Sequence, residues 1–271
     1  MIEHPATASA RPAPVRHPSG GLGDNIIAVA SGKGGVGKTW FSITLAHTLR
    51  KKGRNVLLFD GDLGLANVDI QLGINPGGDL WQVVNGKASF HDIVTRDPAT
   101  GIDVVTGRSG SGELADATED DLDTLARGLA LVGSMYDDVI LDLGAGVDRS
   151  VRRLAANAGR ILVLTNIEPT SITDAYALIK LLKQKSPATP IEVIVNSAQD
   201  YRDGDRTYSK LKMACASFLN FEPPFLGMIH QDTYVPDAIR RQVPLATRHP
   251  TSQAVADVER IASRMLARKE A

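Results

Sequence analysis

The sequence predicts an α/β fold, a doubly wound and mostly parallel sheet flanked by helices. Short apolar runs alternate with helical apolar patterns, which is typical of β-α-β units. Most of these runs are continuous, as in strands buried between two helical layers. A glycine-rich segment also joins the first predicted strand to the first predicted helix. At 271 residues, with 43% hydrophobic and 23% charged residues, the chain is long enough for one large domain.

Apolar runs bounded by glycine and proline define the expected elements. The predicted strands cover residues 26–30, 56–59, 102–105, 139–141, 161–164, 191–195 and 226–229. The predicted helices cover residues 39–52, 119–135, 148–158, 172–185, 207–220 and 251–268. We expect residues 25–271 to form a single domain. Residues 1–24 contain several prolines and no apolar core of a signal peptide, which favours a disordered lead.

The segment between the first strand and helix, residues 32–39, fits the phosphate-binding pattern G-x-x-x-x-G-K-[ST]. Its glycines let backbone N–H groups point at phosphate oxygens beside the positive end of a helix. Lys38 would reach the β- and γ-phosphates, and the Thr39 hydroxyl would bind Mg²⁺. We therefore expect ATP and Mg²⁺ as cofactors. The expected nucleotide contacts are Gly34, Gly35, Val36, Gly37, Lys38, Thr39 and Trp40.

Polar residues end three of the predicted strands, where ligands bind in a doubly wound sheet. Asp60 and Asp62 follow the second strand, Asp142 follows the fourth, and Asn196 follows the sixth. A carboxylate at the position of Asp142 can hold Mg²⁺ near Thr39. Aspartate and asparagine are also common turn and N-cap residues, so a purely structural role is the alternative for each.

The P-loop carries a second lysine, Lys33, and residues 33–39 resemble the deviant Walker A motif of the MinD/ParA family. The resemblance implies an ATP-bound homodimer in which Lys33 touches the partner's phosphates and supports slow ATP hydrolysis to ADP and phosphate. It further implies that Asp62 orients the attacking water, that Asp60 supports the metal and that Asn196 contacts adenine. A solvated loop lysine is the alternative for Lys33.

Two further segments resemble particular branches of that family. Residues 60–69 look like the switch segment of the MinD branch, whereas residues 168–180 and 235–245 are similar to FlhG-type flagellar-number ATPases. The resemblance implies a regulator of flagellar number or placement, with an FlhF-like GTPase or a basal-body component as partner. Three features depart from the pattern. Residues 1–24 lack an Asp-Gln-Ala segment, Leu143 replaces a common threonine, and His230 replaces a common proline near the adenine.

Two other classes compete with this interpretation. A partition or cargo-positioning ATPase would need a basic face for DNA, and Arg149, Arg152, Arg153 and Arg160 are the candidates. DNA binding is not expected from the net charge of −1. A metabolic enzyme of the same fold is the other class, but a ligase would not require Lys33, and one cysteine cannot hold an iron–sulfur cluster.

The remaining features concern compartment and packing. Cys215 is expected to be a buried structural thiol in a cytoplasmic protein. The final predicted helix has an apolar stripe without aromatic residues, so we expect it to pack on the sheet. Association with the inner membrane is expected to be weak at most.

Overall fold

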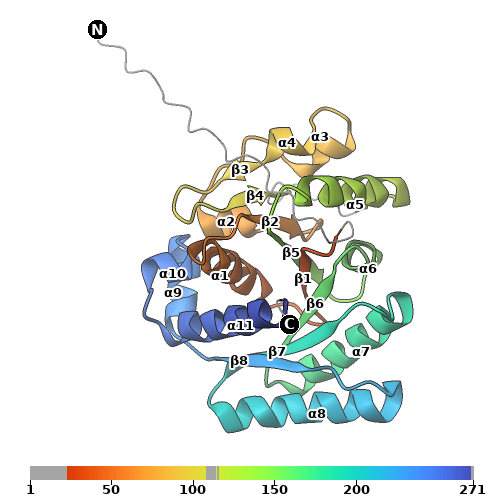
Figure 1. Ribbon diagram of the computed structural model, residues 1–271, viewed down its shortest axis with the longest axis vertical. Helices are drawn as coiled ribbons and strands as arrows, with labels where there is room; N and C mark the ends of the chain where they lie inside the picture. The colour runs from red at the N-terminus through yellow and green to blue at the C-terminus, as the bar shows by residue number, and fades with distance from the viewer. Residues whose placement is uncertain (1–22, 108–113, 115, 270–271) are drawn as a thin grey trace.

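The computed structural model describes residues 23–107, 114 and 116–269, so nearly all of the predicted disordered lead lies outside the described residues. Within them, the chain forms an eight-stranded sheet in the order β3-β4-β2-β5-β1-β6-β7-β8 (Figure 1). Every neighbouring pair is parallel except β3 and β4. The strands are β1 (Ile26–Ser31), β2 (Val56–Gly61), β3 (Thr95–Arg96), β4 (Asp103–Val105), β5 (Asp138–Ala145), β6 (Arg160–Thr165), β7 (Ile191–Ala198) and β8 (Phe225–His230).

Helices cover both faces of the sheet. The helices are α1 (Lys38–Lys51), α2 (Val68–Leu72), α3 (Leu80–Val84), α4 (Phe90–Ile93), α5 (Glu119–Gly133), α6 (Arg149–Ala155), α7 (Pro169–Lys185), α8 (Tyr201–Leu219), α9 (Tyr234–Arg241), α10 (Leu245–Arg248) and α11 (Gln253–Lys269). In Figure 1, α5 to α8 lie on one side of the sheet, and α1, α9, α10 and α11 lie on the other. The predicted doubly wound fold is confirmed.

Each face has its own apolar core, which explains why the central strands are apolar without alternation. Leu57, Leu141 and Val163 point to the side of α5 to α8. Leu58 and Ile140 point to the side of α1 and α11. In this sheet β5 lies between β2 and β1 and is parallel to both, so the carboxyl ends of the three strands lie together.

The last helix, α11, packs against β8 and α1, as the apolar stripe predicts. Val258 and Ile261 on this stripe are fully buried or nearly so. Cys215 is also buried, and burial raises the pKa of its thiol to about 11, in agreement with a structural role. Among the described residues, none of the helices combines the length and the apolar character that a membrane crossing needs.

Two predicted helix starts are wrong. The helix expected at 207 begins at Tyr201, because the Asp200 side chain accepts a hydrogen bond from the Asp203 backbone N–H at 2.8 Å. Gly204 makes this turn look unlike a helix, yet a Cβ there would lie 2.7 Å from Met228 Sδ, so glycine lets α8 approach β8. The helix expected at 172 begins at Pro169, a residue favoured in a first helical turn.

Candidate functional site

The phosphate-binding loop joins β1 to α1 at the carboxyl end of the sheet, as predicted. Gly35 and Gly37 have φ values of 77° and 94°, in the left-handed region that glycine adopts without strain. A Cβ on Gly32 would clash with the backbone of Asp174 in α7. The loop therefore needs glycine both for its curvature and for its contact with α7.

A cavity of about 620 Å³ opens above this loop. Among the residues that line it are the predicted nucleotide contacts Gly34, Gly35, Val36, Gly37, Lys38, Thr39, Trp40 and Asn196, together with Asp62. The N-terminus of α1, whose first N–H groups have no partner within the helix, faces the loop. The structure thus brings residues from three strand ends and α1 to one concave site, which suits a phosphate-containing ligand.

Asp142 lies buried at the base of this site, 1% exposed, and accepts a hydrogen bond from Ser42 Oγ at 2.9 Å. Burial raises the pKa of Asp142 to about 6, while hydrogen bonds from Thr39 and Ser42 and the charge of Lys38 oppose this shift. Burial also lowers the pKa of Lys38, and the nearby carboxylates oppose that shift. The Thr39 hydroxyl and the Asp142 carboxylate are hard oxygen donors in contact, a donor set that fits Mg²⁺.

Asp60 is buried beside Asp142 and organises the segment that follows β2. Its Oδ1 accepts a hydrogen bond from the backbone N–H of Asp62 at 3.0 Å. Its Oδ2 accepts from Asn67 N at 3.0 Å and from Val68 N at 3.1 Å. Burial and the charge of Asp142 raise the pKa of Asp60 to about 8 against these hydrogen bonds. These three hydrogen bonds give Asp60 a structural role, because they hold residues 62–68 in place. The metal-supporting role of Asp60 stays a prediction.

Asp62 is half-buried and lines the cavity. Its Oδ1 accepts a hydrogen bond from the backbone N–H of Leu65 at 3.1 Å. A Cβ on Gly144 would lie 3.3 Å from the same oxygen, so the carboxylate packs against the last residues of β5. This position leaves Asp62 beside the phosphate-binding loop, where a carboxylate can contact a water molecule in the cavity.

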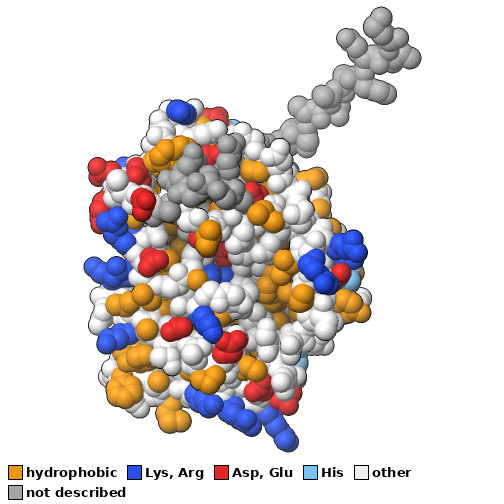
Figure 2. All heavy atoms as spheres, turned by 180° about the vertical axis from the view of Figure 1, so that it is seen from behind, with side chains coloured by type: hydrophobic (Ala, Val, Ile, Leu, Met, Phe, Trp, Pro, Cys, Tyr) orange, Lys and Arg blue, Asp and Glu red, His pale blue; other side chains and the backbone are white. Residues whose placement is uncertain are grey.

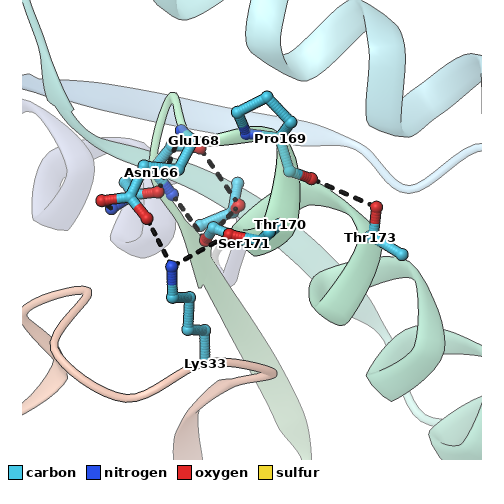
Figure 3. Close-up of polar contacts among 8 residues, drawn as sticks. Lys33, Asn166, Glu168, Pro169, Thr170, Ser171 and Thr173 are labelled. Atoms are coloured by element: carbon cyan, nitrogen blue, oxygen red, sulfur yellow. Dashed lines mark hydrogen bonds and ion pairs between the residues drawn. The ribbon is translucent and has the colours of Figure 1, made fainter.

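Lys33 is not among the residues that line the cavity, and its side chain points toward the first turn of α7 (Figure 3). Its Nζ forms an ion pair with Glu168 and donates a hydrogen bond to Thr170 Oγ1 at 2.9 Å. The hydrogen bond and charge of Lys33 lower the pKa of Glu168. The second lysine of the loop is therefore engaged within the monomer, with a partner in residues 168–180.

Asn196 is 2% exposed and ends the straight part of β7. Its Nδ2 donates a hydrogen bond to the Val36 carbonyl at 2.7 Å, which fixes the amide so that Oδ1 is the free acceptor. Within the described part of the chain, no hydrogen-bond donor reaches Oδ1. The pairing of β7 with β8 shifts between Val195 and Ala198, and Ser197 has a φ of 56°. Asn196 therefore lies at an irregularity of β7, and it is one of the residues that line the cavity.

Three contacts of the site were missed from the sequence. Ser42 follows Thr39 by three residues, so helical spacing could have placed it on the same face of α1. The contact of Lys33 with Glu168 and Thr170 joins residues more than 130 positions apart and has no local signal. Only a fold that brings β1 and β6 together reveals it.

Comparisons with known proteins agree with this geometry. The family model described as the CobQ/CobB/MinD/ParA nucleotide binding domain matches residues 27–245. Antiactivator FleN of Pseudomonas aeruginosa is 36% identical over 229 residues, which cover 84% of this chain and 81% of FleN. Flagellum site-determining protein YlxH of Helicobacter pylori is 29% identical over 250 residues, covering 90% and 82% of the two chains.

Solved structures share the fold. The cell division ATPase MinD of Pyrococcus furiosus has a TM-score of 0.78 at 24% identity, with 92% of this chain and 100% of that chain covered. The septum site-determining protein MinD of Pyrococcus horikoshii, complexed with Mg-ADP, also has a TM-score of 0.78 at 24% identity, with 91% and 98% covered. The phosphate-binding loop, the strand-end carboxylates and these matches together identify the chain as a member of the CobQ/CobB/MinD/ParA nucleotide-binding family.

Proposed function

We propose that this chain is an ATP-dependent dimerising switch ATPase that regulates flagellar number or placement. The observation that carries the proposal is the second lysine, Lys33, in a loop that already has Lys38 for the phosphates. The names of the FleN and YlxH relatives, an antiactivator and a flagellum site-determining protein, support the flagellar assignment.

Within the site, each residue has a separate task. Lys38 places its charge at the β- and γ-phosphates, and burial lowers its pKa while the nearby carboxylates oppose that shift. Thr39 and Asp142 would hold Mg²⁺, which neutralises charge on the phosphate oxygens when bound. Asp62 orients the attacking water, and Asp60 keeps the Asp62 segment in place through its three accepted hydrogen bonds.

Lys33 acts on the phosphates of the partner subunit when two copies close. A cation that arrives only on dimerisation can stabilise the transferring phosphoryl group, as an arginine finger does. To reach a partner, Lys33 has to leave Glu168 and Thr170. Since both side chains of the ion pair are exposed, at 36% and 53%, this exchange costs little.

A DNA-binding role has weaker support. Three of the four arginines that it would use are paired with carboxylates: Arg149 with Glu119, Arg153 with Asp123, and Arg160 with Glu192. On the face drawn in Figure 2, Lys and Arg side chains are interspersed with Asp and Glu side chains. Mixed charges of this kind do not form the continuous basic surface that phosphate backbones need.

Genetic replacement tests the proposal. Cells that lack this chain are expected to have an altered number or position of flagella. A Lys38→Ala allele should reproduce that phenotype at normal protein level, because it removes nucleotide binding and not the chain itself. Normal flagellation in both strains, together with mislocalised DNA, would reject the flagellar role in favour of partitioning.

A further inference from the structure

Trp40 is the first residue after Thr39, and it lines the cavity together with Asn196 and Ile239. The residue is 8% exposed, so most of its surface packs in the protein. A Cβ on Gly37 would clash with Trp40 Nε1 and would lie 2.5 Å from Asn196 Nδ2. The indole and the Asn196 amide therefore both lie against the same glycine of the phosphate-binding loop.

On its other side, the indole packs toward α9 and α10. Trp40 and Ile43 line a separate hollow of about 10 Å³, too small for a ligand, together with Val235, Ile239 and Leu245. Trp40, Val235 and Ile239 line both hollows, so Trp40 lies at the boundary between the large cavity and the packed interface of α1 with α9. Ile43 belongs to this interface and does not line the large cavity.

We propose that the indole of Trp40 is the apolar wall against which the nucleobase packs, and that it sets affinity for the base and not for the phosphates. The inference rests on the proposed ATP site. Asn196 Oδ1 is a buried acceptor without a hydrogen-bond partner among the described residues, and an amide gives no contact to a base face. Trp40 supplies that contact, and stacking on an aromatic ring tolerates any base.

Binding measurements separate the base from the phosphates. The ligands are Mg-ATP, Mg-GTP and Mg-tripolyphosphate, which has no base. Trp40→Leu should weaken binding of ATP and GTP about tenfold, with tripolyphosphate affinity unchanged within about twofold. Ile43→Ala, which disturbs the same interface with α9 outside the large cavity, should bind all three ligands as the parent does.

Fluorescence gives a second readout that keeps the indole in place. The chain has two tryptophans, so Trp81→Phe leaves Trp40 as the only one. Its emission should change on addition of Mg-ATP and stay constant with Mg-tripolyphosphate. In the matched variant Trp40→Phe, emission from Trp81 in α3 should respond to neither ligand. This readout decides the matter even if Trp40→Leu does not fold.

Three results would overturn the inference. One is parent-like ATP affinity in Trp40→Leu, and another is an equal loss for ATP and tripolyphosphate, which would mean that the indole only supports the phosphate-binding loop. The third is a Trp40 emission that ATP leaves constant. Failure of the proposed function would give a different result. The parent would then bind neither Mg-ATP nor Mg-tripolyphosphate in a Lys38-dependent way, and the inference would fail with it.

Discussion

Lys33 of the phosphate-binding loop and Glu168 at the start of α7 form an ion pair within one subunit (Figure 3). Thr170 adds a hydrogen bond of 2.9 Å to the same Nζ. The lysine that would act in the partner subunit therefore has competing contacts within its own subunit. On dimerisation Lys33 would exchange Glu168 and Thr170 for the partner's phosphates, so the strength of the contacts within the subunit affects the monomer–dimer equilibrium.

Glu168→Gln should shift that balance toward the dimer. Removing the charge weakens the hold on Lys33, so the ATP-dependent dimer should dissociate about two- to fivefold less readily. The free energy of unfolding of the monomer should fall by less than about 1 kcal/mol, since the pair is exposed. Sedimentation velocity with Mg-ATP across protein concentrations measures the first quantity.

A matched control is Glu222→Gln, which removes a similarly exposed ion pair with Lys212 on α8. It should leave dimerisation unchanged. Weaker dimerisation in Glu168→Gln would mean that Glu168 helps to present Lys33 to the partner instead of competing with it.

Asp62→Ala should separate binding from hydrolysis. The variant keeps Lys38 and the phosphate-binding loop, so it should bind ATP with parent-like affinity and accumulate as a dimer. Hydrolysis should slow at least about 100-fold, because the attacking water loses its carboxylate. Titration with Mg-ATP and a phosphate-release assay test both parts. Hydrolysis at the parent rate would assign the water to another residue.

Asn196 should make the site prefer ATP to GTP. Its Oδ1 is buried and has no hydrogen-bond partner among the described residues. If the base reaches this atom on binding, the 6-amino group of adenine would donate to it, whereas the 6-oxo group of guanine would place two acceptors face to face. We expect ATP to bind about tenfold more tightly than GTP, and Asn196→Ala to lose most of this preference. Competition between the two nucleotides measures the ratio, and equal affinities in the parent would contradict the assignment.

His47 should make folding sensitive to acid. It is 5% exposed, its Nδ1 has no hydrogen-bond partner among the described residues, and burial and then Lys51 lower its pKa from 6.5 to about 4. Between these values the unfolded chain binds the proton and the folded chain does not. Stability is therefore complete above pH 6.5 and declines as pH falls toward 4, by up to about 3 kcal/mol.

Urea unfolding of the parent and of His47→Gln across that range isolates the contribution, because other groups cancel in the difference. The variant should show a smaller loss of unfolding free energy between pH 6.5 and pH 4. Parallel curves would mean that His47 is solvated in the folded protein.

The central strands of the sheet were predictable from the sequence because strands buried on both faces are continuous apolar runs. All seven predicted strands occur, and Asp62 follows β2 as predicted. Asp142 and Asn196 do not follow their strands but lie inside β5 and β7, because both strands continue past the apolar runs that predicted them. The shortest elements were not predicted because they have too few residues to show a hydrophobic period in the sequence. They are the two-residue β3 and the helices α2, α3, α4 and α10. Helix α9 was also missed, and Pro236 in its first turn hides it.

Parts of the site depend on contacts that sequence spacing does not encode. The free Oδ1 of Asn196 follows from its bond to Val36, 160 positions away, and from the left-handed Ser197. The contact of Lys33 with Glu168 likewise requires the fold. Residue types indicated what kind of chemistry the site performs, and only tertiary structure showed which atoms are already occupied.

The most direct test of the dimerising ATPase is turnover per subunit across a series of protein concentrations, for the parent, Lys33→Ala and Lys38→Ala. The parent rate should rise with concentration as dimers form. Lys33→Ala should bind ATP and stay at a low, flat rate, and Lys38→Ala should neither bind nor hydrolyse it. Turnover that is independent of concentration and equal in the parent and Lys33→Ala would contradict the account.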